Sequence, residues 1–190
     1  MNRRYELKER ARHQARTRQR IVEAAVELHT SVGPARTTIS AIAQRAGVER
    51  HTVYAHFPDD RALFRACSEH WTAAHPLPEL ETLTEMPDPE RRLSRALGGL
   101  YDWYASVEHD LAVLYRDAPV VPANAEALEE MTNYLAAFAV AVARGRPRRK
   151  TVRAAIGHAL EFETWRSLER THGLSRAQAV EAMTRFISSS

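Results

Sequence analysis

The stretch Thr38–Phe57 reads TISAIAQRAGVERHTVYAHF and predicts two short helices that are joined by a tight turn. Apolar residues recur at helical spacing on both sides of Gly47, and Ala43 is small enough to let the two helices cross closely. Gly47 stands where the predicted turn needs a positive backbone φ, which glycine adopts at little cost. The spacing is typical of a helix-turn-helix whose second helix enters the major groove of DNA, although any helical hairpin with a glycine turn shares it.

Helical periodicity continues outward from this motif, and no run of alternating β-branched residues predicts a strand. Prolines and glycines fall between the periodic segments and mark their ends. The predicted helices cover residues 16–32, 39–46, 50–56, about 60–72, 89–106, 108–117, 122–144, 148–172 and 175–187. The fold class is therefore all-α with about nine helices. The stretch 75–90 is rich in Pro and Glu and divides the chain, so we expect a basic arm over 1–15, a helix-turn-helix domain over 16–72 and a second helical domain over 73–190.

Positive charge is concentrated toward the N-terminus. The chain of 190 residues has a formal net charge of +3; residues 1–75 contain 13 basic and 8 acidic side chains, and residues 76–190 contain 14 and 16. A basic end on a nearly neutral body indicates an anionic polymer or an anionic surface as partner. The basic residues of the first twenty could follow DNA phosphates or belong to a solvated helical extension, and the sequence leaves both open.

Other classes of protein find no support in the sequence. It contains no nucleophile elbow, no phosphate-binding glycine loop and no metal-binding histidine motif, so we predict neither an enzyme nor a cofactor nor a metal site. The single cysteine, Cys67, lies on an apolar helical face and is expected in the core. No apolar run reaches the ~18 residues of a membrane span. These features predict a cytoplasmic protein without a membrane partner.

The motif and its surroundings resemble the N-terminal domain of TetR-family transcriptional regulators, over about residues 16–72. The resemblance rests on Arg20-Ile21, Ala24-Ala25, Leu28, Gly33, Thr38, Ile42-Ala43, Ala46-Gly47-Val48, Val53-Tyr54, His56-Phe57 and Ala62-Leu63. It implies a homodimer that binds double-stranded DNA at an operator with two-fold symmetry, and a C-terminal domain that binds a small effector and then releases the DNA. We therefore predict a sequence-specific regulator of the repressor type.

The resemblance also implies roles for individual residues. Those expected to contact DNA are Thr38, Ser40, Arg50, His51, Thr52, Tyr54, His56, Arg18 and Arg20. Among them Arg50, His51 and Thr52 would face the bases, Ser40 would touch the backbone or a base edge, and the others would contact the backbone. Two positions depart from the family pattern: Glu49 stands where Ser or Thr is frequent, and Asp60 stands where a phosphate-binding lysine is frequent.

The second domain is predicted less specifically. Its aromatic residues could line an effector pocket or simply pack in the core. The pocket candidates are Trp103, Tyr104, Tyr134, Phe138 and Phe162, and the candidates for a dimer interface are Ile156, Ala159, Trp165 and Met183. Two other interpretations remain at this point. The chain could be a helical-bundle protein without DNA binding, for example an enzyme, or a regulator that has lost its ligand.

Overall fold

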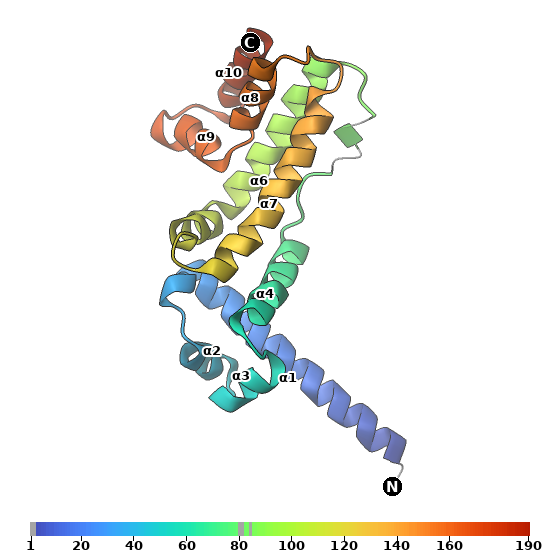
Figure 1. The fold of residues 1–190 in the computed structure, drawn as a ribbon, viewed down its shortest axis with the longest axis vertical. Helices are drawn as coiled ribbons and strands as arrows, with labels where there is room; N and C mark the ends of the chain where they lie inside the picture. Colours follow the sequence, from blue (N-terminus) through green and yellow to red (C-terminus); the bar gives the residue numbers. More distant parts are fainter. Residues whose placement is uncertain (1–2, 80–81, 84) are drawn as a thin grey trace. The chain divides into compact units, whose positions relative to one another are not determined.

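The computed structural model describes residues 3–79, 82–83 and 85–190 (Figure 1). Over these residues it contains nine α-helices and no β-strand, as the sequence predicts. The chain divides into two compact units. Unit 1 comprises residues 1–76 and 109–128, and unit 2 comprises 77–108 and 129–190. Unit 1 therefore takes in the segment 109–128, which the sequence analysis assigned to the second domain.

The N-terminal part of unit 1 contains four α-helices and one 3-10 turn. They are α1 (Arg3–Ser31), η1 (Pro34–Arg36), α2 (Ile39–Ala46), α3 (Arg50–His56) and α4 (Asp60–Ala74). The bounds of α2 and α3 confirm the prediction. Helix α1 begins thirteen residues earlier than the predicted residue 16, so residues 3–15 form its N-terminal half. The residues at 1–2 lie outside the described part of the chain.

Local signals define the pair α2–α3. The side chain of Thr38 caps α2 by accepting a hydrogen bond from the backbone N–H of Ala41 at 3.1 Å. Gly47 ends α2 in the left-handed conformation, with φ +65°, as the sequence predicts. The backbone N–H of Val48 then donates to the carbonyl of Ala43 at 3.0 Å, which satisfies one of the free carbonyls at the helix end.

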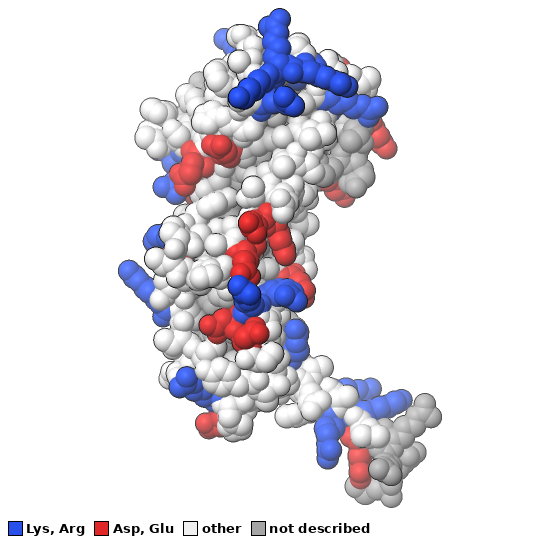
Figure 2. Space-filling view, viewed as in Figure 1, with Lys and Arg blue, Asp and Glu red and all other residues white. Residues whose placement is uncertain are grey.

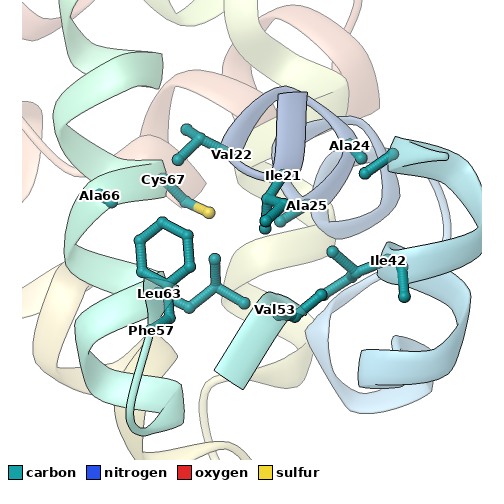
Figure 3. Close-up of a cluster of buried hydrophobic side chains, with 12 residues drawn as sticks. Ile21, Val22, Ala24, Ala25, Ile42, Val53, Phe57, Leu63, Ala66 and Cys67 are labelled. Carbon is teal, nitrogen blue, oxygen red and sulfur yellow. The ribbon is translucent and has the colours of Figure 1, made fainter. Parts of the chain in front are cut away.

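Small apolar side chains join the helices of unit 1 in one core. Figure 3 shows Ile21 and Ala25 of α1 turned toward Ile42 of α2, Val53 of α3 and Leu63 of α4. Cys67 lies in the same cluster, and burial raises the pKa of its thiol to about 12. This confirms its predicted place in the core. The chain thus presents α2 and α3 on a single hydrophobic support.

Unit 2, together with the segment 109–128, is built from the remaining helices. They are α6 (Pro89–Asp117), α7 (Pro122–Ala143), α8 (Lys150–Ala159), α9 (Phe162–Arg166), the π-helical turn η2 (Ser167–Thr171) and α10 (Arg176–Ser188). Helices α6 and α7 each belong to both units along their length. The bounds of α7 and α10 lie close to the predicted ones.

Three of the predicted helices in the second half of the chain are wrong in their bounds. Residues 89–106 and 108–117 form a single helix, because the buried Val107 continues the apolar face of Leu100, Tyr104 and Leu111 without a break. The expected single helix over 148–172 instead ends at residue 159 and resumes at residue 162.

The break within 148–172 has a cause outside the segment itself. The hydroxyl of Tyr101 donates to the carbonyl of Ala159 at 2.8 Å, and that of Tyr104 donates to the carbonyl of Leu160 at 2.7 Å. These buried hydroxyls satisfy backbone carbonyls that a continuous helix would have used itself. The chain can therefore turn there without leaving those carbonyls unpaired.

None of the helices within the described ranges combines the length and the apolar character that a bilayer crossing requires.

The buried histidine of unit 1 predicts a pH dependence of stability. Burial lowers the pKa of His29 from 6.5 to about 4. Below pH 6.5 the unfolded chain binds a proton at this residue before the folded chain does, so the free energy of unfolding falls between pH 6.5 and about 4. From this shift we expect a loss of up to about 3 kcal/mol.

The measurement is urea unfolding of the wild type and of His29→Phe at half-unit steps between pH 4 and 8. The difference between the two free energies isolates His29 from the carboxyl groups that titrate in the same range. Two parallel curves would contradict the assigned pKa.

Candidate nucleic-acid interface

The polar side chains predicted to contact DNA lie on the outer face of α2 and α3. Thr38, Ser40, Arg50, His51 and Tyr54 are exposed. Thr52 and His56 are half-buried, on the side of α3 that turns toward the core residue Val53. Seven of the nine predicted residues therefore lie on α2 and α3 or at the cap of α2, and Arg18 and Arg20 lie on α1.

The start of α2 is prepared for an anion. The oxygen of the Thr38 hydroxyl already accepts the N–H of Ala41, which leaves its proton free to donate outward. The N-terminus of the helix carries a partial positive charge, and Ser40 adds a second exposed hydroxyl two residues after the cap. A phosphate oxygen in front of α2 would meet both donors and the helix dipole.

Arg50 and Tyr54 form a pair along α3. The guanidinium of Arg50 donates to the hydroxyl of Tyr54 at 3.2 Å and lies 5.6 Å from the centre of its ring. The two residues are four apart, so they neighbour each other on the helix surface. Glu49 precedes them as the N-cap of α3 and makes no capping hydrogen bond with its side chain. Tyr54 therefore directs the guanidinium of Arg50 along the exposed face.

The basic residues of α1 differ from one another in their surroundings. Figure 2 shows Lys and Arg side chains along the N-terminal half of α1. The guanidinium of Arg18 lies 4.9 Å from the centre of the Phe57 ring, so this residue packs on the core as well as carrying charge. Arg20 is exposed and makes no hydrogen bond or ion pair with any residue that the structure describes.

The start of α4 departs from the expected phosphate contact. Asp60 is exposed, and the neighbouring Arg61 forms an ion pair with Glu126 of α7 at 2.7 Å. Arg61 is therefore engaged within unit 1 and does not replace the lysine that is frequent at this place in the family.

Sequence reasoning missed a contact that fixes the entry to α2. The carboxylate of Asp117, at the end of α6, accepts a hydrogen bond from the N–H of Ala35 at 3.0 Å and one from Nε of Arg116 at 2.7 Å. The hydrogen bonds from Arg116 and Ala35 hold the pKa of Asp117 below its usual range. Gly33 has a φ of +101°, and it lies so close to Arg116 and Asp117 that an added Cβ would overlap both of their side chains. The positive φ strains any other residue at this position, and a Cβ would also displace the ends of the Arg116 and Asp117 side chains.

The predicted pocket residues belong mostly to the core of unit 2. Trp103, Tyr104, Phe138 and Phe162 are buried, and Tyr134 is half-buried and donates its hydroxyl to the carbonyl of Pro78. Phe138 lines a hollow of about 550 Å³. The other walls of this hollow include Pro78, Leu83, Arg95, Gly98, Gly99 and Asp102.

The predicted interface residues are also mostly internal. Ile156, Ala159 and Trp165 are almost fully buried within the chain itself, so their side chains are not available on its surface. Met183 of α10 is half-buried, and its neighbour Phe186 is 47% exposed. Of the four predicted residues, Met183 is the one on α10, and Phe186 beside it is the more exposed apolar side chain.

Comparison with known proteins agrees with this architecture. Residues 21–67 match the family model described as "Bacterial regulatory proteins, tetR family", which spans the end of α1 through most of α4. No curated protein matches the chain.

Solved structures share the fold over almost the whole chain. A TetR-like transcriptional regulator and a second transcriptional regulator, both from Rhodococcus sp. RHA1, are 18% and 21% identical with TM-scores of 0.60 and 0.61. Each match covers 90% of this chain, and 93% and 94% of the respective regulator. The multidrug binding protein EbrR, solved in complex with imidazole, is 24% identical with a TM-score of 0.58, over 89% of this chain and 93% of EbrR.

An exposed polar helix pair on a small hydrophobic core defines the chain as a helix-turn-helix protein that binds DNA and regulates transcription. Residues 21–67 match the helix-turn-helix domain of TetR-family transcriptional regulators, and the chain as a whole shares its fold with solved regulators. This class acts by binding DNA, in agreement with the prediction that the chain is not an enzyme.

Replacing Gly47 by valine tests the backbone at the turn. An added Cβ at Gly47 meets no atom within 4 Å, so only the positive φ opposes a side chain there. A β-branched residue in this region costs about 1–3 kcal/mol. We expect Gly47→Val to lower the Tm and to weaken binding to operator DNA, because the turn orients α3.

Gly173 offers a matched control for this change. Its φ is +67°, an added Cβ again meets no atom within 4 Å, and it lies in unit 2. Gly173→Val should lower the Tm to a similar extent without changing the affinity for DNA. Wild-type DNA affinity in Gly47→Val would show that α3 keeps its orientation without a glycine at this position.

Arg50→Ala and Arg20→Ala separate base recognition from phosphate contact. A bidentate arginine–guanine contact contributes ~1–3 kcal/mol of discrimination, so Arg50→Ala should weaken operator binding far more than binding to a scrambled duplex. Arg20→Ala should weaken both equally and reduce the slope of log affinity against log salt by about one for each site removed.

Fluorescence anisotropy with both duplexes at several salt concentrations measures these effects. Equal losses on both duplexes for Arg50→Ala would instead assign Arg50 to the phosphates and leave base recognition to His51, Thr52 or Ser40.

Proposed function

We propose that this regulator is a repressor that binds a two-fold symmetric operator as a homodimer and leaves it when a small effector binds unit 2. The observation that carries the proposal is the exposed polar face of α2 and α3, whose approach segment Gly33–Arg36 is held by the end of α6. A regulator of this kind would act in the cytoplasm on double-stranded DNA.

The assignment of DNA contacts follows from the chemistry of each side chain. The fork of Arg50 suits guanine, and His51 and Thr52 lie beside it on the first turn of α3. Thr38, Ser40, Tyr54 and His56 would donate to phosphates on the two sides of the groove. Arg18 and Arg20 of α1 would contact the backbone beyond them, where position along the DNA is set without base recognition.

The hollow in unit 2 supports an effector site. Its volume of about 550 Å³ lies in the range of small-molecule sites, ~300–1,000 Å³. Phe138 and Leu83 supply apolar surface, and Arg95 and Asp102 supply opposite charges. EbrR, which shares the fold, is described as a multidrug binding protein. A ligand with an apolar body and a polar group suits this lining.

The paired glycines of α6 favour this interpretation over a regulator without a ligand. Glycine in a helix interior costs about 1 kcal/mol relative to alanine. A Cβ added at Gly98 would meet no atom within 4 Å, so packing does not require glycine at this position. The missing side chain leaves space beside the helix, and a ligand that filled it would lie against the same helix whose end binds Ala35 through Asp117.

The homodimer would use the exposed faces of α8 and α10. Phe186 and the half-buried Met183 place apolar surface on α10, and exposed Arg153 and Ala154 lie on α8. The buried residues Ile156, Ala159 and Trp165 would then support this interface from beneath and would not contact the partner directly.

Sedimentation velocity tests the dimer and the operator together. At micromolar concentration we expect about twice the chain mass of 21.5 kDa, and two chains on one duplex that carries an inverted repeat from the DNA flanking the gene. Phe186→Glu should shift the protein toward the monomer and weaken operator binding, because it places a charge in the proposed apolar interface.

Val140→Glu is the matched control, since Val140 is 75% exposed on α7, outside the proposed interface. A monomeric wild type, or dissociation by both substitutions alike, would reject the α8–α10 interface.

A further inference from the structure

A second hollow, in unit 1, contains a polar group that DNA binding does not use. It is bounded by α1, the α1–α2 connection, α2, α4 and the first residues of α7, and its volume is about 450 Å³. Its walls are mainly apolar and include Ile39, Ile42, Leu63, Phe64, Val121 and Ala123. This size and lining are those of a site for a small organic molecule.

His29 is the polar group of this hollow. Its side chain is 6% exposed, and its ring stacks on Phe64 with the ring centres 4.4 Å apart and the planes at 16°. Within the described ranges its ring nitrogens make no hydrogen bond. Burial lowers its pKa to about 4, so at neutral pH the ring is uncharged and offers one N–H donor and one acceptor nitrogen.

The other polar groups around the hollow are either engaged or exposed. The hydroxyl of Thr37 donates to the carbonyl of Gly33 at 2.8 Å, and Arg61 is paired with Glu126 at 2.7 Å. Asp60 is exposed, where water solvates its carboxylate. An anionic ligand would meet Asp60, and a cationic one would find no buried counter-charge, because the one buried polar group is a neutral imidazole.

We propose that this hollow binds a neutral aromatic alcohol of the phenol class. The ring packs between Ile39, Leu63 and Phe64, and the hydroxyl forms a hydrogen bond with a ring nitrogen of His29. This bond adds one oriented polar contact to the apolar packing of the ring. The site is distinct from the effector site proposed for unit 2. Because Ile39 and Ile42 form part of its wall, its occupant touches the helix that carries Ser40.

Phenol and toluene are the two probes, since they differ only in the hydroxyl group. With the full-length wild type, isothermal titration calorimetry should show phenol binding at least about tenfold more tightly than toluene. Phenol should also shift the side-chain nitrogen resonances of His29 in ¹⁵N NMR spectra. Absence of phenol binding at millimolar concentration, or equal affinity for the two probes, overturns the proposal.

Three variants test whether phenol binds in this hollow. His29→Phe keeps the aromatic stack but removes the hydrogen bond, so it should bind phenol and toluene about equally. Ala123→Leu fills the hollow and should abolish phenol binding, whereas Ala125→Leu makes the same change at an exposed position of α7 and should leave it intact. Phenol binding that survives Ala123→Leu would place the ligand elsewhere and reject the site. The ¹⁵N shifts and the phenol–toluene ratio of the wild type keep the test decisive if a variant fails to fold.

Discussion

Burial of one face of α1 beneath α2, α3 and α4 is the contact on which the DNA-reading surface depends. Helix α3 has seven residues, far fewer than an isolated helix needs to be stable in water. The position of α3 therefore depends on residues outside this helix or on its inner face. Val53 is buried in the same core as Ile21, and the turn at Gly47 joins α3 to α2. Because the helix pair is short and closely packed, the polar groups on its outer face are held in place by residues that never touch DNA.

Much of this arrangement can be read from the sequence because its signals are local. The cap at Thr38, the glycine at 47 and the apolar spacing between them lie within one short stretch, and the structure confirms each. The break in the segment 148–172 could not be predicted in this way. It depends on Tyr101 and Tyr104, whose hydroxyls bind carbonyls 58 and 56 residues further along the chain.

The same distinction applies to the site. Exposure of Ser40, Arg50 and Tyr54 follows from the helical phase of buried neighbours, so local reasoning finds them. Aromatic residues in the second half show periodicity but not whether a cavity lies beside them, and most prove to be packed in the core. The hydrogen bond between Asp117 and Ala35 joins residues that are 82 positions apart, so no local sequence pattern predicts it.

The junction of Gly33 with Asp117 also bears on how such regulators can be recombined. A chimaera that joins only residues 1–76, here called the DNA-binding head, to the effector domain of another regulator would lack Arg116 and Asp117. The transplanted head would then carry a glycine at the entry to α2 that faces no carboxylate, and the N–H of Ala35 would lose its acceptor. The portable module is therefore discontinuous, and a functional graft must include the end of α6 as well as the head.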